Sequence, residues 1–352
     1  MIAKKPEKPS LASTGLWFVD PSHIDSVSAT TDGIVTDGQS AGTYSDIPAQ
    51  QTKTLLSRLA VQPWRQVIKD LYEHQNPWLY RIVTDPSRAT PMELFDLHPD
   101  CTCLDVGSGW GQLAIPLSQA GCRVVALDLT LERLRALRFI AAQEEVELSF
   151  AKGNILTFPF QEGTFDIALF NGALEWVGTG RGPAQSIRQC QVLALRRAAR
   201  ALKTGGILYI GIENSIGLKY LMGARDDHTS LPFFSYRSEE EADEMMRAAG
   251  GDRTPTKTWG LAQLRLLASE AGLRVHSVYG CFPDYKLPRH LVPLEDVNEF
   301  LLQWEIDWTE HHGDRGEPLA DQDTLRSAYR QLADSGIAQW FCPSYAIMLV
   351  KP

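Results

Sequence analysis

The chain has 352 residues, of which 44% are hydrophobic and 22% charged, and its formal net charge is −9. This composition is typical of a water-soluble folded protein, and the acidic balance argues against a broad surface that binds nucleic-acid phosphates. No stretch approaches the roughly 20 apolar residues that span a bilayer, residues 1–13 lack a signal-peptide core, and the six cysteines fit no disulfide framework, zinc site or iron–sulfur cluster.

The first 95 residues form two segments of different character. Residues 1–50 are rich in Ser, Thr, Gly and Asp and contain two Thr-Asp-Gly turn signals, so we expect an extension that is partly disordered or forms short hairpins. Apolar residues recur at helical spacing over 52–72, and a second helix is predicted over 77–83. Residues 51–95 are therefore expected to form a helical cap over the ligand edge of the domain that follows.

The most informative segment is 104–111, Leu-Asp-Val-Gly-Ser-Gly-Trp-Gly. An apolar run ends in three alternate glycines, Gly107, Gly109 and Gly111, and a helix-compatible stretch follows at once. This pattern predicts a buried parallel strand, a tight loop and a helix start. The G-x-G-x-G spacing differs from the G-x-G-x-x-G that suits a pyrophosphate, so it favours a nucleoside ligand without a diphosphate.

Polar or glycine residues end the other predicted strands too. The apolar run 124–127 ends in Asp128, which can accept hydrogen bonds from ribose hydroxyls or, in the other interpretation, cap the helix that follows. A strand near 148–150 leads to Asn154 and Ile155, where the amide could pair with an adenine amino group. The strand 165–171 ends in Asn171, and a further strand covers 207–212. Ligands of open α/β sheets bind at this edge, where the carboxyl ends of the strands meet.

Five segments in this order resemble class I S-adenosylmethionine (SAM)-dependent methyltransferases: LDVGSGWG (104–111), VVALD (124–128), GNIL (153–156), FDIALFNGALEWV (165–177) and ALKTGGILYIGIEN (201–214). The resemblance implies an α/β Rossmann-like fold with a mainly parallel sheet and helices on both faces. It places the core at 96–283 and 339–352, interrupted by a helical insertion at 284–338 that forms the acceptor site or a lid. The chain departs from the family in having Asn154 where many members have Asp, and it lacks the Asn-Pro-Pro-Tyr signature of amino-group and nucleobase methylators.

The resemblance also implies SAM as cofactor and S-adenosylhomocysteine as product. A carboxylate in the middle of an apolar strand is costly, so Asp105 is expected to pair with loop amides or with the methionine ammonium. Asn171, Gly172 and Glu175 follow the fourth strand, beside the expected sulfonium. The expected cofactor-binding residues are Asp105, Gly107, Gly109, Gly111, Asp128, Asn154, Ile155, Asn171 and Gly172.

Methyl transfer from a sulfonium requires in-line positioning, and a hydroxyl nucleophile also needs its proton removed. His228, flanked by Asp226 and Asp227, is the first candidate for the general base, and Glu213 at a strand end is the second. The other interpretation is that residues 226–229 form only a structured turn. The residues expected to contact the acceptor are Asn214, Tyr285 and Lys286.

Segments 212–220, 226–229 and 282–288 resemble methyltransferases of bacterial surface-polysaccharide and secondary-metabolite biosynthesis. This implies O-methylation of a hydroxyl on a small molecule or glycan. We expect a cytoplasmic protein with no membrane span and no nucleic-acid partner. We also expect no metal, because adjacent His311 and His312 do not face one site on a helix. A homodimer remains open.

Two other functions stay open: a nicotinamide-dependent oxidoreductase, which the missing G-x-G-x-x-G disfavours, and a non-catalytic partner protein with the same fold, which the intact glycines disfavour. Trp304 and Trp308 belong to a lid or to the core. The arginines of the predicted helix after Asp128 are interpreted as a solvated face; they are Arg133, Arg135 and Arg138.

Overall fold

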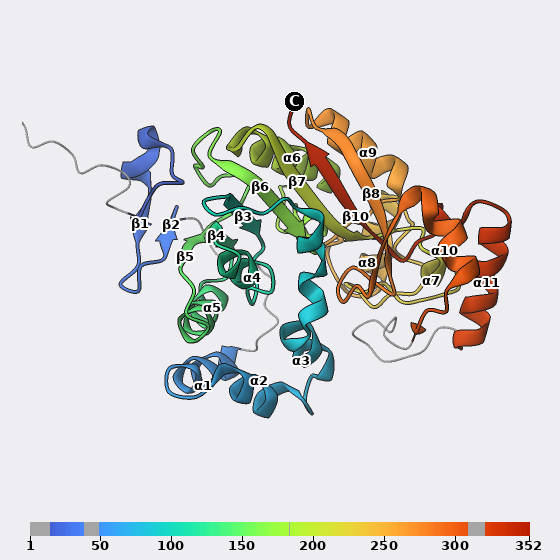
Figure 1. Cartoon of the computed structure of the whole chain (residues 1–352), viewed down its shortest axis with the longest axis horizontal. Coiled ribbons are helices and arrows are strands. Elements are labelled where there is room, and N and C mark those ends of the chain that lie inside the picture. Colours follow the sequence, from blue (N-terminus) through green and yellow to red (C-terminus); the bar gives the residue numbers. More distant parts are fainter. Residues whose placement is uncertain (1–14, 39–48, 183, 309–320) are drawn as a thin grey trace, which may run out of the picture.

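The computed structural model describes residues 15–38, 49–182, 184–308 and 321–352. Their centre is a ten-stranded sheet with the order β1-β2-β5-β4-β3-β6-β7-β10-β8-β9 (Figure 1). Five central strands are parallel, and β10 runs antiparallel between its two neighbours. The predicted α/β sheet is thereby confirmed. These strands are β3 (Thr102–Val106), β4 (Arg123–Asp128), β5 (Leu148–Lys152), β6 (Phe165–Asn171), β7 (Leu202–Glu213), β8 (Arg274–Phe282) and β10 (Ser344–Val350).

Both edges of the sheet are extended by short strands from outside the central domain. A hairpin of β1 (Ser28–Ala29) and β2 (Val35–Thr36) adds to β5 in parallel register. At the other edge β9 (His290–Pro293) pairs antiparallel with β8. The segment 284–338 was expected to be helical, so its edge strand is a difference that the sequence pattern did not indicate.

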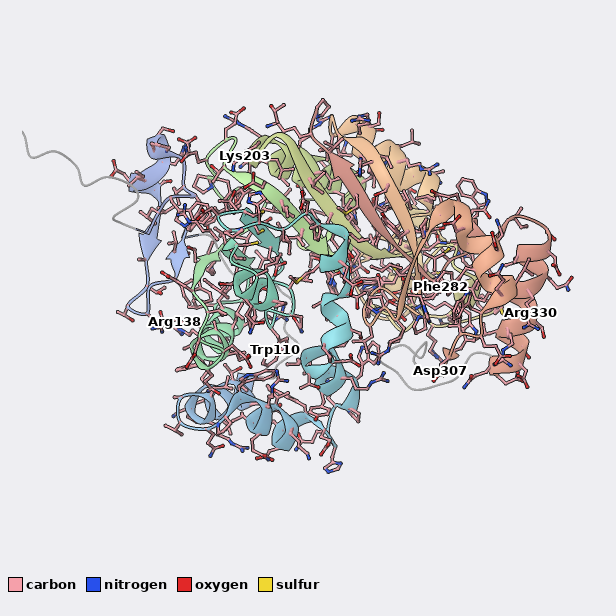
Figure 2. All side chains as sticks on the ribbon, viewed as in Figure 1. Trp110, Arg138, Lys203, Phe282, Asp307 and Arg330 are labelled. Carbon is pink, nitrogen blue, oxygen red and sulfur yellow. The ribbon has the colours of Figure 1, made fainter. Side chains whose placement is uncertain are left out.

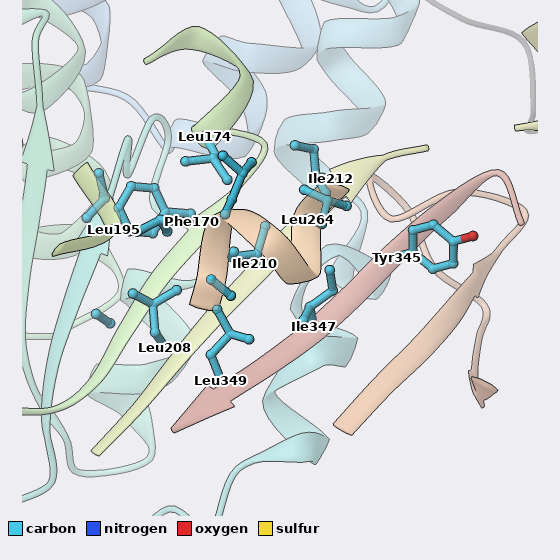
Figure 3. Close-up of a cluster of buried hydrophobic side chains, with 14 of the residues drawn as sticks. Phe170, Leu174, Leu195, Leu208, Ile210, Ile212, Leu264, Tyr345, Ile347 and Leu349 are labelled. Carbon is cyan, nitrogen blue, oxygen red and sulfur yellow. The ribbon is translucent and has the colours of Figure 1, made fainter. Parts of the chain in front are cut away.

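Different helices cover the two faces of the sheet, because alternate strand residues point to opposite sides. Leu104 and Val106 of β3 pack with α6 (Ile187–Ala201) and α9 (Leu261–Glu270). Cys103 packs on the other face with α4 (Ala114–Gln119) and α5 (Leu131–Gln143). The prediction of helices on both faces is confirmed. Figure 3 shows part of the first layer, in which labelled side chains of β6, β7 and β10 meet Leu195 and Leu264.

The predicted helix over 52–72 is two helices, α1 (Ala49–Leu59) and α2 (Trp64–Tyr72), because Pro63 lacks the N–H that a continuous helix needs. Both pack on α5 (Figure 1). They are followed by α3 (Pro77–Thr84) and a 3₁₀ segment, η3 (Pro86–Leu94), in which Arg88 and Thr90 donate to the carbonyls of Lys286 and Pro288. Trp110 of the glycine loop, labelled in Figure 2, belongs to the buried cluster of α1 and α2, and its ring centroid lies 6.1 Å from that of Tyr72.

The remaining helices follow β7 and β9. Trp308 is buried and stacks on Tyr329 with ring centroids 4.6 Å apart, whereas Trp304 is 59% exposed, so Trp308 belongs to the core. His311 and His312 lie outside the described residues. No helix in the described ranges is long and apolar enough to cross a membrane. The remaining α-helices are α7 (Leu218–Leu221), α8 (Glu239–Ala248), α10 (Val297–Gln303) and α11 (Gln322–Asp334). Short 3₁₀ turns occur throughout the chain; they are η2 (Pro21–Ser26), η4 (Leu174–Trp176), η5 (Leu294–Asp296) and η7 (Ala338–Trp340).

Candidate active site

The glycine loop between β3 and α4 has positive φ at all three glycines: 72° at Gly107, 53° at Gly109 and 83° at Gly111. A Cβ at Gly107 would lie 2.8 Å from that of Ala173, and one at Gly111 would overlap Leu137. At Gly109 the nearest atom would be 3.8 Å away. Packing therefore explains two of the glycines, whereas a side chain at the third would make only ordinary contacts with Gly107, Gln112 and Arg133.

Asp128 at the end of β4 lies directly beside this loop. Its Oδ2 accepts a hydrogen bond from the Gly109 amide at 3.1 Å and lies 3.4 Å from Nη1 of Arg133. Its Oδ1 accepts from the Thr130 amide at 2.8 Å. Arg133 is buried, so the expected solvated face is wrong for this residue, although Arg138 is exposed. The carboxylate thus lies against the glycine loop at Gly109.

Asp105 is almost completely buried within β3. Burial raises the pKa of its carboxyl to about 7, while the Arg88 guanidinium opposes that shift and the Asp128 carboxylate adds to it. Arg88 comes from η3 and donates to the Lys286 carbonyl at 3.0 Å. No local pattern marked Arg88, because its neighbours here are distant in sequence.

Asn171 and Gly172 end β6 at the same edge of the sheet. The Asn171 Oδ1 is buried and has no hydrogen-bond partner among the described residues. A Cβ at Gly172 would lie 2.6 Å from the Tyr285 hydroxyl, so only glycine allows that side chain to approach. Asn154 turns its Oδ1 to the Leu156 amide at 3.0 Å, and its contact with adenine stays a prediction, as does that of the buried Ile155.

Beyond Gly172, an imidazole and two carboxylates from separate segments meet in the interior. The His228 Nε2 is 3.8 Å from Glu175 Oε1 and 3.9 Å from Glu213 Oε1. These side chains are at most 6% exposed. Tyr285 donates to Glu175 Oε1 at 3.3 Å. The structure thus brings together His228, Glu213 and Tyr285, three of the residues that we predicted for the site.

Two buried lysines extend this cluster. The Lys286 Nζ lies 2.5 Å from Glu213 Oε1 and 3.0 Å from Asp227 Oδ2. The Lys219 Nζ lies 2.8 Å from the same Asp227 oxygen and 3.4 Å from Asp284 Oδ2. A continuous chain of alternating charge therefore runs from Asp284 to Glu213. We predicted Lys286 as a site residue but not Lys219, although both lie in segments that resemble the polysaccharide and secondary-metabolite methyltransferases.

The surrounding charges decide the protonation of His228 and Glu213. Burial opposes a charge on His228, but the Glu213 carboxylate, together with Asp226 and Glu175, holds the pKa of the imidazole well above its usual value. Burial raises the pKa of Glu213, and Lys286 opposes that shift. His228 is therefore an imidazolium in this arrangement, which disfavours it as a general base. Glu213 is the better candidate for that role.

The turn at 226–229 has the capping geometry of the alternative interpretation as well. Asp226 Oδ1 accepts from the amides of His228 and Thr229, at 3.0 and 2.8 Å. Burial opposes the charge on Asp226, but the His228 imidazole, whose Nδ1 lies 3.8 Å from Asp226 Oδ1, leads the effects that lower the pKa of Asp226 to about 2. The turn consequently holds the imidazole against the two glutamates.

Asn214 has a different place from the one expected. It is fully buried, and its Nδ2 lies within hydrogen-bond distance of the Trp340 and Cys342 carbonyls and the Tyr345 hydroxyl. Its Oδ1 accepts from the Ile216 amide at 3.2 Å. The expectation of a substrate contact is therefore wrong: the side chain fastens the end of β7 to the turn before β10.

Glu175, Glu213 and His228 also form a donor set of the kind that binds metal ions, with one ligand atom from each within 4.8 Å of the others. Here the Lys286 ammonium already lies against Glu213 Oε1 and supplies positive charge. The Oε2 atoms of both glutamates are buried without a partner among the described residues. The cluster thus presents unsatisfied acceptors rather than a formed metal site.

Residues 104–210, from β3 to β7, match a family model described as a methyltransferase domain, which confirms the family resemblance. An uncharacterized protein of Mycobacterium tuberculosis is 42% identical over 66 residues, 19% of this chain and 24% of that protein. The chain thus matches about a quarter of the length of this relative. The cypemycin N-terminal methyltransferase of Streptomyces is 27% identical over 196 residues, 51% of this chain and 76% of that protein. The solved structure of the CcbJ methyltransferase of Streptomyces caelestis is similar at a TM-score of 0.43 and 15% sequence identity. The match covers 76% of this chain and 89% of the CcbJ chain.

Proposed function

We propose that this chain, which carries a methyltransferase domain at residues 104–210, transfers the methyl group of SAM to a hydroxyl of a small molecule or glycan. The observation that carries the proposal is the meeting of two sites at one edge of the sheet. One is the glycine loop beside Asp128, where packing does not require Gly109; the other is the buried cluster with unpartnered carboxylate oxygens. A methyl donor and its acceptor need such neighbouring sites.

The residues at the glycine loop fit SAM by chemistry and by space. The Asp128 carboxylate suits ribose hydroxyls, and the absence of a side chain at Gly109 lets a ligand approach the backbone. Asp105 and the unpartnered Asn171 Oδ1 offer acceptors for the ammonium group, and Arg88 offers a guanidinium for the carboxylate. When bound, SAM supplies a methyl group that its sulfonium already activates.

The acceptor cluster favours a group that donates hydrogen bonds. Its buried unpartnered atoms include Glu175 Oε2 and Glu213 Oε2, both of which are acceptors when the glutamates are ionised. A hydroxyl satisfies such atoms and must lose its proton when it is methylated. Glu213 can take that proton at Oε2, because Lys286 holds the other oxygen. The His228 imidazolium then holds both glutamates in place.

Titration calorimetry with S-adenosylhomocysteine tests the cofactor half of the proposal. We expect binding by the wild type and a loss of about tenfold or more in Asp128→Asn, because charge-assisted hydrogen bonds are each worth about 1.5–3 kcal/mol. Glu162→Gln is the control, since that exposed acid pairs only with Arg200 at the surface. No binding at millimolar ligand would refute the proposal.

The acceptor half is tested by incubating the protein with SAM and separate panels of polyols, phenols and amines. The measurement is the mass of each acceptor after reaction. Methylation of a hydroxyl acceptor, lost in Glu213→Gln, is the expected result. Methylation confined to amines would overturn the hydroxyl assignment while leaving the methyltransferase proposal intact. A change in NADH fluorescence on mixing would instead favour an oxidoreductase.

A further inference from the structure

Three of the six cysteines meet at the end of the sheet opposite the candidate active site. Cys101 precedes β3 and Cys103 lies within it, so two-residue spacing puts both side chains on one face. Thr102 is opposite Arg123 in the β3–β4 register, which places Cys122 beside Cys101. The sulfurs of Cys101 and Cys103 are 4.0 Å apart, and all three sulfurs lie within 4.8 Å of one another.

This spacing is close to that of thiolates around one metal ion. Zinc–sulfur bonds of about 2.3 Å in a tetrahedral site separate the sulfurs by about 3.8 Å. A disulfide needs its two sulfurs at about 2.05 Å and would use only two of the three. The three thiols are free and at most 4% exposed. Small side-chain movements would therefore convert the cluster into a three-thiolate ligand set.

The two turns that carry the cysteines lie side by side. His98 is exposed in the turn before β3, and its carbonyl accepts from the Cys101 amide at 3.1 Å. The Asp100 amide donates to the Gly121 carbonyl at 3.3 Å, which joins this turn to the one that carries Cys122. His98 is therefore the histidine to test as a fourth ligand, in addition to the three thiolates.

We propose that Cys101, Cys103 and Cys122 bind one soft divalent cation, such as Zn²⁺ or Cd²⁺, with His98 or water as the fourth ligand. Binding exchanges three thiol protons for the ion, which leaves a charge of −1 on the metal–thiolate unit. The ion links the start of β3 to the start of β4, whereas Asp105 and Asp128 lie toward the other ends of these two strands. The site is independent of the methyl-transfer proposal, since it lies at the other end of these strands.

The alternative is ordinary apolar packing, because all three cysteines belong to a hydrophobic cluster with Leu117 and Val124. The two interpretations differ in whether the protein binds a thiophilic metal ion. The test uses the full-length, reduced protein with Zn²⁺ and Cd²⁺ as probes. Native mass spectrometry measures retained Zn²⁺ after desalting, and ultraviolet spectroscopy measures the sulfur-to-metal charge-transfer band of Cd²⁺.

We expect one retained Zn²⁺ per chain, a Cd²⁺ band that saturates at one equivalent, and a Tm raised by a few degrees at saturating metal. Cys103→Ala should weaken binding by at least about tenfold, because it removes one of the thiolate ligands. Cys190→Ala is the matched control, a buried cysteine on α6 outside the cluster, and should bind as the wild type does.

No retained Zn²⁺ and no Cd²⁺ band in the wild type would overturn the proposal, as would equal binding by Cys103→Ala. Circular dichroism checks the fold of each variant. If Cys103→Ala does not fold, Cys122→Ala, at the edge of the cluster, replaces it. The wild-type Cd²⁺ titration decides the proposal without any variant.

Discussion

Lys219 is a buried cation, and within the described part of the chain its charge partners at hydrogen-bonding distance are two buried aspartates, Asp227 and Asp284. Burial works against its charge, but Asp227 and then Asp284 raise its pKa above the ordinary value. Removing one partner of a buried pair leaves the others uncompensated in a medium of low dielectric constant. The ammonium also keeps Asp227 in the position from which it holds Lys286.

Lys219→Met should therefore lower the free energy of unfolding by about 3–5 kcal/mol, as measured by urea denaturation. The control is Arg200→Met, which breaks an exposed ion pair with Glu162 and should cost less than about 1 kcal/mol. Equal effects of the two substitutions would show that the buried chain of charges does not stabilise the fold.

At the scale of elements, the loop from β3 to α4 contains two glycines, Gly109 and Gly111, whose surroundings differ. Gly111 is needed because a side chain would enter the space of Leu137 on α5. Gly109 has positive φ, but an added Cβ would make only ordinary van der Waals contacts, the nearest at 3.8 Å. Packing thus requires Gly111 but not Gly109, which lies in the loop where we propose that SAM binds.

Substituting each glycine by alanine separates these requirements. Gly111→Ala should lower stability by about 1–3 kcal/mol through overpacking, in addition to the strain of a positive φ. Gly109→Ala should cost only the strain, about 1–2 kcal/mol, yet weaken S-adenosylhomocysteine binding by at least about tenfold. Thermal unfolding and calorimetry measure the two effects. Wild-type affinity in Gly109→Ala would place the ligand away from this part of the loop.

At the scale of the whole molecule, the charged cluster joins segments that are far apart along the chain. Glu175 follows β6, Glu213 ends β7, His228 lies between α7 and α8, and Lys286 follows β8. Folding brings these groups together and changes their protonation. The cluster therefore links the stability of the entire domain to pH.

For His228 the folded-state pKa lies well above the unfolded value of 6.5. Its contribution to stability is thus complete below about pH 6.5 and is lost as the pH rises through the folded pKa. Wild type should lose more stability than His228→Gln between neutral and alkaline pH, as measured by urea denaturation at each pH. His276→Gln, on an exposed position of β8, is the control and should follow the wild type. Parallel curves for all three proteins would contradict the ionised state of His228.

Short-range patterns were sufficient for the central strands, the glycine loop and the position of Asp128, because alternation, glycine φ preference and strand ends are properties of neighbouring residues. The same local reasoning joined 52–72 into one helix although Pro63 divides it, and it assigned Asn214 to a substrate that the side chain cannot reach. Pro63 cannot donate the backbone hydrogen bond that a continuous helix needs, and the Asn214 amide donates to the backbone carbonyls of Trp340 and Cys342.

What the amino-acid sequence determined by itself is the order of strands and helices and the polar residues at the strand ends. Only the tertiary structure decided that Lys219 and Lys286 share Asp227, that Arg88 reaches Asp105, and that Cys122 joins Cys101 and Cys103. The physical reason is that burial and charge act through space. The protonation of His228 depends on Glu213 and Glu175, which are 15 and 53 residues away along the chain and approach it only when the sheet is assembled.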